Sequence, residues 1–494
     1  MTGSQPRDRR ILLSYSRALF DPTLPPERHE LWGASANVIS RTLYEILGRH
    51  GEVTYADATA PEEVAGQRFD LFLGIQRNFG KFLDACEIDR SILIAVNMHP
   101  EEHNRLLLDF VVREGLPTAA IHPLDLHDVE ARTRDIAAAD AILVFGNVGT
   151  LNSYVRNGVP VEKIKVAYFG SDLWSGERSL ERRGAPGETH ILYCASEIGL
   201  RKGFDIVDGG MTESDLGELG AHLHIAGSAS YPHYRAKLEQ LEQRLGDRVT
   251  NHGWLDSSGP KYRNLLESVD YILFPSLEEG QVGTVLDAMA RGVIPLISQN
   301  CGNDFAPLGF CELAVSSERN RDLLRRACEL SAAERDRLRE WTYEYYDEFH
   351  GGFERKLDRA VGDLIAGEPR PQVSVVLPVH NKERILEDLL KPLDRALRSY
   401  GAVDLCLILD GCTDDSEGIA RRFFEGRDDY PVTILTTPDI FEVKTNNLGL
   451  KRATGRYAMI VQDDNFIYEP GCILEAVTLM EQSSRAAIVG GLAG

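Results

Sequence analysis

Short apolar runs alternate with helix-forming stretches along nearly the whole sequence. Between Ile11 and about Gly170 these runs are ILLSYS, DLFLGI, SILIAV, AILVFG and KIKVAYFG. A second series follows, consisting of HILYCAS, AHLHIAG, DYILFPS and VIPLIS. Strands that alternate with helices in this way are typical of βαβ units on a parallel sheet. The pattern therefore predicts two Rossmann-like α/β halves in series.

Two polar segments divide the chain. SGERSLERRGAPGE, from Ser175, predicts a linker between the two halves, and EPRPQ at 368–372 contains two prolines that stop a helix and favour extended chain. Between these segments, residues 332–365 carry aromatic and leucine positions at helical spacing, so we expect a pair of helices that packs back across both halves. A third α/β unit follows the prolines, and the predicted domains are residues 1–172, 173–368 and 369–494.

The third unit has its own alternation of strands and helices. Its predicted strands are VSVVLP, DLCLIL, VTIL and YAMIVQ. Its helices are expected to begin at about Glu383, Ser416, Lys444 and Pro470.

Composition limits the class of protein and its partners. With 494 residues, 43% hydrophobic and 26% charged, the chain is long enough for about three compact units. A formal net charge of -22 argues against nucleic acid as a partner and favours small molecules or glycans. The sequence contains no apolar run of about 18 residues, and its first ten residues lack the apolar core of a signal peptide. We therefore expect a cytoplasmic protein, with peripheral contact at the inner face of the cell membrane left open and the oligomeric state not predicted.

The cysteines show no pattern that indicates a disulfide framework. All eight are scattered and form no CxxC pair. This spacing predicts reduced structural thiols and indicates neither disulfides nor a zinc site.

The first candidate site lies in FPSLEEGQVGTVLDAMAR, which starts at Phe274. Glu279 follows a predicted strand, and Asp287 lies eight positions further on, in the helix that comes next. Gly280 and Gly283 allow the backbone between them to approach a ligand closely, and the free N–H groups at the start of the helix favour a phosphate. Such a site suits a diphosphate, with the carboxylates left for sugar and ribose hydroxyls. The alternative is that the two acids are a solvated loop acid and a helix-surface acid.

This segment resembles the signature of glycosyltransferase family 4, in which two glutamates seven residues apart precede an AMA-G-P tail. The stretches LRKGFD and HGWLD also resemble family motifs, and the resemblance covers about the first 345 residues. It implies a GT-B fold and transfer from a nucleotide-sugar donor with retention of anomeric configuration and without metal. By the family's pattern, Glu279 and Lys202 are catalytic, with Glu279 on the sugar and Lys202 on the diphosphate, while Asp287 binds the ribose.

Several positions depart from that pattern or match it weakly. The second family glutamate is Asp287 here, and Glu197 stands at the position that usually holds an arginine. Gly33 lies at the family's first strand–helix turn, as a donor-binding candidate. His99 and Asn97 fall near a family histidine that faces the acceptor. The stretch FGNVG lacks the third glycine of a dinucleotide loop, so we expect a plain helix start there.

The second candidate site lies in the third unit, where LILDGCTDDS and YAMIVQDDN follow predicted strands. Carboxylates at the ends of parallel strands line the crevice in which ligands bind. Asp463 and Asp464 are spaced for one hard cation, Mg²⁺ or Mn²⁺, whose shell a diphosphate would complete, and Asn465 can add a carbonyl ligand. The alternative is a cluster of solvated turn acids.

This unit resembles glycosyltransferase family 2. The resemblance rests on VSVVLPVHN, on Asp410-Gly411-Cys412-Thr413-Asp414 where the family has D-G-S-T-D, on Asn447-Leu448-Gly449, and on the acid cluster at Asp463. It implies a GT-A fold and a metal-dependent inverting transfer. Asp410 would lie near the nucleotide base, and Asp463 with its neighbours would surround the metal and the donor. Leu409 replaces the first acid of the family's D-D-G-S, and Asn465 stands where D-x-D would end.

The family places its acceptor site and general base after the metal motif, and about thirty residues follow Asn465 here. We therefore expect that the general base of this truncated GT-A unit lies beyond Gly494 and that the unit binds donor without completing transfer.

These observations lead to one hypothesis and two alternatives. The hypothesis is a GT-B glycosyltransferase fused to the donor half of a GT-A transferase, which in the full-length protein adds sugars to a cell-surface polysaccharide or a lipid-linked glycan. The first alternative is an impaired donor-binding or scaffold GT-B module that supports the GT-A transferase. The second is a GT-B sugar-nucleotide epimerase, which does not explain the appended unit.

Overall fold

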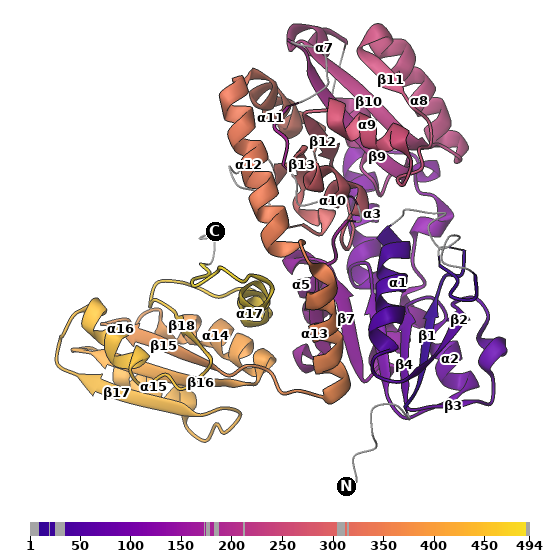
Figure 1. Cartoon of the computed structure of the whole chain (residues 1–494). Helices are drawn as coiled ribbons and strands as arrows, with labels where there is room; N and C mark the ends of the chain where they lie inside the picture. The colour runs from indigo at the N-terminus through magenta and orange to yellow at the C-terminus, as the bar shows by residue number, and fades with distance from the viewer. Residues whose placement is uncertain are drawn as a thin grey trace. The chain divides into compact units, whose positions relative to one another are not determined.

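The computed structural model describes residues 9–18, 20–24, 35–171, 173, 178–181, 187–210, 213–303, 312–313 and 316–490 (Figure 1). By its internal contacts the chain divides into two compact units. Unit 1 consists of residues 1–153 and 165–362, and unit 2 consists of residues 154–164 and 363–494. Most of the predicted linker from Ser175 lies outside the described residues. Among the described helices, none is long and apolar enough to cross a membrane.

The first lobe of unit 1 is built on a six-stranded sheet in the order β2-β1-β4-β6-β7-β8. Each adjacent pair from β2 to β7 runs parallel. The inner strands β1, β4, β6 and β7 are mostly apolar because both faces of such a sheet are covered; Ile11, Leu12 and Leu13 are fully buried. The strands are β1 (Arg10–Tyr15), β2 (Glu52–Asp57), β4 (Leu71–Ile75), β6 (Ser91–Ala95), β7 (Ala141–Phe145) and β8 (Ile164–Ala167).

Helices follow the strands of this lobe as the sequence predicts. They include α1 (Ser35–Leu47) after β1, α3 (Pro100–Glu114) after β6 and α5 (Val148–Arg156) after β7. The FGNVG stretch is the turn from β7 into α5, so the predicted plain helix start is confirmed.

The second lobe has a six-stranded sheet in the order β11-β10-β9-β12-β13-β14, and every pair in it is parallel. This order matches the Rossmann arrangement, with the strand order reversing between β9 and β12. The strands are β9 (Thr189–Glu197), β10 (Ala221–Ser228), β11 (Val249–Asn251), β12 (Tyr271–Phe274), β13 (Ile294–Ser298) and β14 (Glu312–Leu313). The site helix α10 (Gly283–Ala290) connects β12 to β13.

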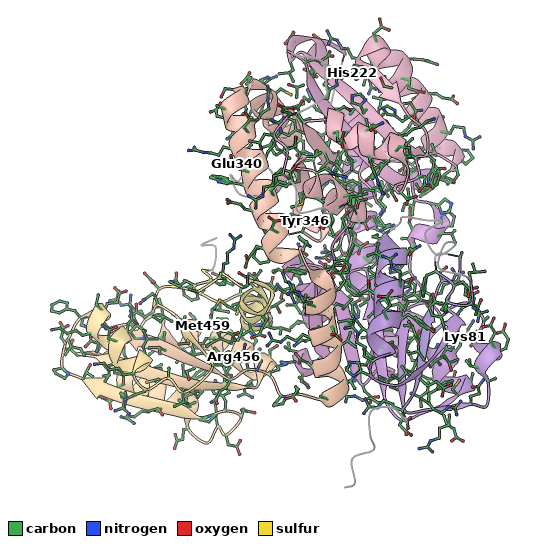
Figure 2. The ribbon with its side chains drawn as sticks, in the orientation of Figure 1. Lys81, His222, Glu340, Tyr346, Arg456 and Met459 are labelled. Atoms are coloured by element: carbon green, nitrogen blue, oxygen red, sulfur yellow. The ribbon has the colours of Figure 1, made fainter. Side chains whose placement is uncertain are left out.

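Two helices join the lobes of unit 1. They are α12 (Ala332–Phe349) and α13 (Phe353–Ala366), which confirm the helix pair predicted over 332–365. A capping box of Ser331 and Glu334 starts α12, which packs on α10 and β13 of the second lobe. Tyr346, from the other end of α12, accepts a hydrogen bond from the Ser171 amide beyond β8 (Figure 2). From α13, Asp358 pairs with Arg49 of the first lobe at 2.7 Å.

Unit 2 contains a four-stranded sheet in the order β17-β16-β15-β18, in which every pair is parallel. The strand order reverses between β15 and β18, so the ends of these strands form the expected ligand edge. The strands are β15 (Val373–Val379), β16 (Val403–Asp410), β17 (Val432–Thr437) and β18 (Tyr457–Ile460), and the helices are α14 (Leu386–Tyr400), α15 (Ser416–Phe424), α16 (Glu442–Leu450) and α17 (Cys472–Gln482). The predicted α/β class with parallel sheets is confirmed.

Candidate active sites

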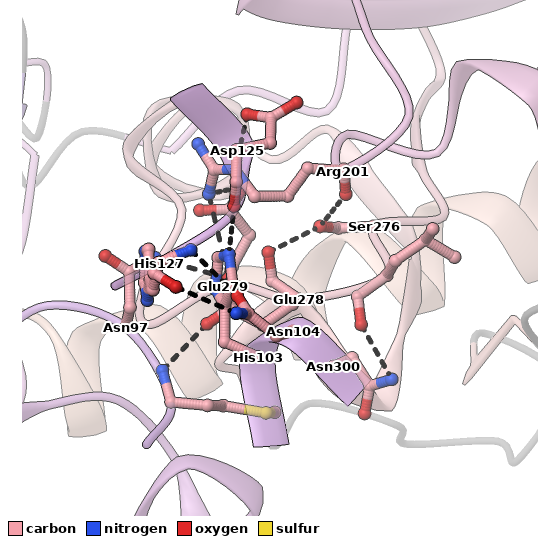
Figure 3. Close-up of polar contacts among 12 residues, drawn as sticks. Asn97, His103, Asn104, Asp125, His127, Arg201, Ser276, Glu278, Glu279 and Asn300 are labelled. Carbon is pink, nitrogen blue, oxygen red and sulfur yellow. Dashed lines mark hydrogen bonds and ion pairs between the residues drawn. The ribbon is translucent and has the colours of Figure 1, made fainter. Parts of the chain in front are cut away.

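The loop between β12 and α10 carries Glu278 and Glu279 at the carboxyl edge of the second lobe's sheet (Figure 3). Ligands of open parallel sheets bind at this edge, beside the reversal of strand order. Glu279 is almost completely buried and is paired with two cations. Its Oε1 contacts Lys202 Nζ and lies 2.9 Å from a terminal nitrogen of Arg201. The structure therefore brings the predicted Glu279 and Lys202 together and adds Arg201.

The site shifts the pKa values of Arg201 and Lys202 in opposite directions. Burial lowers the pKa of Lys202, and the Arg201 charge lowers it further, although Glu279 opposes both effects. Burial also works against the Arg201 charge, but Glu279, Glu278 and Asp125 together raise the pKa of Arg201. Two adjacent cations thus share the acids of this loop, and they form a group that can bind an anion such as a diphosphate.

Glu278 is fully buried and is bound by the first lobe. Its carboxylate accepts a 2.7 Å hydrogen bond from the Met98 amide and lies 2.7 Å from Nδ1 of His103, which is also buried. The other ring nitrogen of His103 lies 2.6 Å from the Asp125 carbonyl oxygen. Both ring nitrogens of His103 thus lie next to oxygen atoms, one from a side chain and one from the backbone. Burial alone would raise the pKa of Glu278, but His103, Arg201 and the Met98 amide bring that pKa down to about 2.

Asp287 lies on α10, and hydroxyl groups bind both of its oxygens. Ser171 donates to Oδ1 at 2.5 Å, and Tyr262 donates to Oδ2 at 3.2 Å. The predicted ribose ligand is therefore held by two protein donors.

The two predicted glycines make close approaches to the first lobe. A Cβ atom at Gly280 would lie 2.2 Å from the carbonyl oxygen of Val96 and 2.6 Å from that of Phe145. A Cβ atom at Gly283 would lie 2.5 Å from that of Ser35. In this structure, the absence of side chains at both positions allows the two lobes to meet.

The weaker candidates of the first lobe separate into two groups. Asn97 donates to Glu278 at 3.3 Å, so it reaches the site. His99 is buried and caps α3, where its Nδ1 accepts the Glu101 amide, and burial lowers its pKa to about 4. Gly33 lies outside the described residues.

Among the described residues, Glu197, which stands where the family usually has an arginine, does not contact Glu278 or Glu279. It lies at the end of β9, and its carboxylate accepts from the amide and the hydroxyl of Ser230, both at 2.7 Å. The cation beside Lys202 is instead Arg201.

In unit 2, Asp410 ends β16 and is held by the segment that follows β17. Its Oδ1 accepts from the Thr437 hydroxyl at 3.0 Å and from the Ile440 amide at 2.9 Å. Burial would raise the pKa of Asp410, but these two donors and the Thr445 hydroxyl lower it. Asp410 is therefore a fixed carboxylate at the ligand edge of the sheet.

His380, at the end of β15, connects the two acids of unit 2. Its ring nitrogen Nδ1 lies 2.5 Å from the carbonyl oxygen of Asp410, and its amide donates to Asp463 at 2.9 Å. Lys382 Nζ lies 3.3 Å from the other oxygen of Asp463. Asp464 and Asn465 follow with exposed side chains. Asp410, predicted to lie near the nucleotide base, and Asp463, predicted to bind the metal, are thus both in contact with His380.

The oxygen ligands at Asp463, Asp464 and Asn465 suit a hard cation in their chemistry. Asp463 faces the Lys382 ammonium group, so a metal ion here would compete with that group for the carboxylate. Within the part of the chain that the structure describes, no three His, Cys, Asp or Glu side chains gather into a metal site by themselves. A cation here would therefore take its remaining ligands from the oxygens of a bound diphosphate or from water.

The sequence prediction missed four residues of these two sites. Arg201 is adjacent to the predicted lysine and Glu278 is adjacent to the predicted glutamate, so a wider window around each motif would have included them. His103 lies one helical turn beyond His99 on α3, and helical periodicity alone would have placed both on one face. The contacts of His380 are made across strands and leave no local signal in the sequence.

Comparison with known proteins agrees with both motif assignments. Residues 192–332 match the family described as "Glycosyl transferases group 1", and residues 374–494 match "Glycosyl transferase family 2". The two segments are therefore glycosyltransferase domains of these two types, and the predicted resemblances are confirmed. Glycosyltransferases are enzymes of the transferase class.

One curated relative and two solved structures illustrate the similarity. The probable glycosyltransferase YdaM of Bacillus subtilis (strain 168) is 24% identical over 122 residues, which are 24% of this chain and 29% of the relative. The sucrose-phosphate synthase of Thermosynechococcus elongatus is 16% identical with a TM-score of 0.49, over 73% of this chain and 100% of that chain. WaaG, a glycosyltransferase involved in lipopolysaccharide biosynthesis, is 15% identical with a TM-score of 0.47, over 72% and 100%.

Proposed function

We propose that the two glycosyltransferase domains of this chain bind nucleotide-sugar donors and serve the extension of a glycan. The acceptor we propose is a cell-surface polysaccharide or a lipid-linked glycan, and a lipid-linked acceptor would bring the chain to the membrane surface. In this proposal the domain in unit 1 transfers with retention and without metal. The domain in unit 2 belongs to an inverting, metal-dependent reaction.

The observation that carries the proposal is the connection through His380 in unit 2. The ring of His380 contacts the backbone carbonyl of Asp410, and the amide of His380 donates to the Asp463 carboxylate. His380 therefore lies between two acids, an arrangement that suits an extended ligand with amide or amino groups at one end and anionic groups at the other, as in a nucleoside diphosphate. Asp410 would accept from the base, and Asp463, Asp464 and Asn465 would hold a Mg²⁺ or Mn²⁺ ion. That ion would neutralise the diphosphate and allow it to lie beside the acids.

In unit 1, the chain's own cations take the corresponding role. Arg201 and Lys202 would exchange Glu279 for the oxygens of the diphosphate, since charge-assisted bonds to phosphate are strong for both side chains. Glu279 would then be released to bind the transferred sugar, and Asp287 would bind the ribose.

The test uses the full chain and a panel of radiolabelled nucleotide sugars, with and without EDTA. Glu279→Gln should abolish the donor turnover that persists in EDTA, and Asp463→Asn should abolish the donor binding that requires Mn²⁺. Glu340→Gln, which changes an exposed acid on α12, is the matched control and should change neither. If the wild-type chain bound none of the nucleotide sugars under either condition, the proposal would be refuted.

A second candidate for unit 1 is a scaffold that supports unit 2 without its own turnover. The observation that favours it is the saturation of the site by protein contacts. Glu279 is paired with two cations, Asp287 is bound by two hydroxyls, and Gly280 packs against the first lobe. Under this candidate, EDTA-resistant turnover is absent in the wild type, whereas the Mn²⁺-dependent binding by unit 2 is intact. The same panel therefore separates the two candidates.

A further inference from the structure

Phe441 has an unusual backbone conformation at the start of α16. Its φ is 68° and its ψ is 151°, a region that is almost confined to glycine. Its side chain is 73% exposed, so burial of the ring does not offset the backbone strain. A strained non-glycine residue with an exposed aromatic ring calls for a functional explanation, because such strain concentrates at ligand sites.

The surrounding bonds hold this conformation against its cost. The carbonyl oxygen of Phe441 accepts from the Lys444 amide at 3.0 Å and from both the amide and the hydroxyl of Thr445 at 3.1 Å. On the other side, the neighbouring Ile440 amide donates to Asp410. The backbone of Phe441 is thus fixed directly beside the carboxylate that ends β16.

The position lies on the ligand edge of the sheet. Residues 438–441 leave the carboxyl end of β17, which pairs with β16 as far as Thr437 and Asp410. Ligands of such sheets bind outside the carboxyl ends of the strands. An aromatic ring that is exposed here and fixed at its backbone is available to a ligand that also reaches Asp410.

We propose that the Phe441 ring is the stacking surface for the nucleobase of the donor in unit 2. This inference rests on the proposed function, because it assumes that a nucleoside diphosphate binds beside Asp410. The flat face of a base can stack on a phenyl ring whatever the base is, while hydrogen bonding to Asp410 depends on the donors that the base presents. Phe441 therefore supplies affinity, and Asp410 supplies discrimination between bases.

Three variants of the full chain separate the ring from the backbone. Phe441→Ala removes the ring and keeps the strain, and it should weaken Mn²⁺-dependent binding of UDP or GDP roughly 5- to 140-fold, the range expected for loss of one base–aromatic stack. Phe441→Gly removes both, so it should weaken binding to the same extent while raising the melting midpoint of unit 2. Val443→Ala, a matched control two residues along with a side chain that is 71% exposed, should leave the affinity unchanged.

A fluorescent variant reports on the site directly. The four tryptophans, Trp32, Trp174, Trp254 and Trp341, all lie within unit 1. Phe441→Trp would therefore place a single indole in unit 2, and its emission should change when UDP or GDP stacks on it. Titration of this variant with and without Mn²⁺, beside calorimetry of the wild type, gives the measurement.

The outcomes distinguish the inference from the proposed function. Mn²⁺-dependent nucleotide binding by the wild type with an affinity within twofold in Phe441→Ala would overturn the inference and leave the proposed function standing. An exposed ring that serves only as a protein contact would give the same result. If the wild type bound no nucleotide in Mn²⁺, both would be overturned.

Discussion

Replacing Glu278 by glutamine tests how the two lobes of unit 1 are held at the candidate site. The carboxylate is fully buried, accepts a hydrogen bond from the Met98 amide and lies 2.7 Å from Nδ1 of His103. Glutamine keeps the shape and one acceptor oxygen but removes the charge. Its neutral amide would replace the carboxylate that Met98, His103 and Arg201 surround, so the buried contact loses its charge.

The expected cost follows from the environment of Glu278. Its surroundings hold the pKa of Glu278 below the ordinary value, so they favour the charged form of this buried side chain. Breaking a buried ion pair by removing one partner costs about 3–5 kcal/mol in other proteins. We expect Glu278→Gln to destabilise unit 1 by about 3 kcal/mol, the lower end of this range, because glutamine keeps one acceptor oxygen for the Met98 amide.

Tryptophan fluorescence during urea unfolding is the appropriate assay, because all four tryptophans lie in unit 1 and none lies in unit 2. Glu340→Gln is the control and should change the stability by less than about 0.5 kcal/mol. A double-mutant cycle with His103→Gln should show a coupling energy of about 1–3 kcal/mol. A loss of less than about 1 kcal/mol in Glu278→Gln would refute the argument that the buried Glu278 carboxylate depends on its partners in the first lobe.

Three further predictions concern stability in the two units. Burial lowers the pKa of His224 from 6.5 to about 3, and the neighbouring His222, His190 and His252 add to this effect. The folded chain therefore favours neutral His224, and the stability that this group contributes is present above pH 6.5 and is lost as the pH falls below that value. Between pH 7.5 and 5.5, the free energy of unfolding of unit 1, measured by fluorescence, should fall by about 1.4 kcal/mol because of His224. His224→Gln should remove this part of the pH dependence, and an unchanged pH dependence would contradict the assignment. Arg339→Met should destabilise unit 1 by about 3 kcal/mol in the same assay, because it leaves the buried Asp270 without its arginine partner. A stability equal to that of the wild type would show that Asp270 does not depend on this partner. In unit 2, Asp394→Asn should lower the stability by about 2 kcal/mol, because the buried carboxylate accepts hydrogen bonds from two arginines and one tyrosine. Hydrogen exchange should show faster exchange of the backbone amides of unit 2, and unaltered protection would contradict this prediction.

Much of the fold could be predicted because its signals are local. Continuous apolar runs mark the buried parallel strands, so the start of β15 at Val373 and the start of α15 at Ser416 agree with the prediction. The ends of elements depend on partners instead. The run YAMIVQ was expected to be strand to its end, but β18 stops at Ile460, where its pairing with Val376 of β15 ends. The pairing partner of a strand end is not encoded in the run itself.

The candidate sites divide in the same way. Glu279 and Asp463 follow strands, so the sequence motif and the fold rule together predict their place at the sheet edge. What the motif could not predict is how each charge is balanced. Glu278 contacts His103 of the other lobe, 175 positions earlier in the chain, and only the folded arrangement brings the two together. Lys382 reaches Asp463 in the same non-local manner.

Under the proposed function, the charges at the two sites give a physical reason for a difference in metal requirement. At the unit 1 site, the cations Arg201 and Lys202 face the acids Glu278, Glu279 and Asp125. A diphosphate would replace Glu279 as the partner of these two cations, which would then offset part of its charge without an external ion.

At the unit 2 site, Lys382 is paired with Asp463. The donors to the Asp410 carboxylate are a neutral hydroxyl and a neutral amide, and a further amide donates to Asp463. These dipoles fix the carboxylates in the ionised form, as the lowered pKa of Asp410 indicates, but they do not cancel the charge. A diphosphate that approaches this edge is repelled unless a divalent ion lies between it and the acids. The same donor chemistry would therefore depend on a metal in unit 2 and proceed without one in unit 1, and the difference follows from which side chains neutralise the acids.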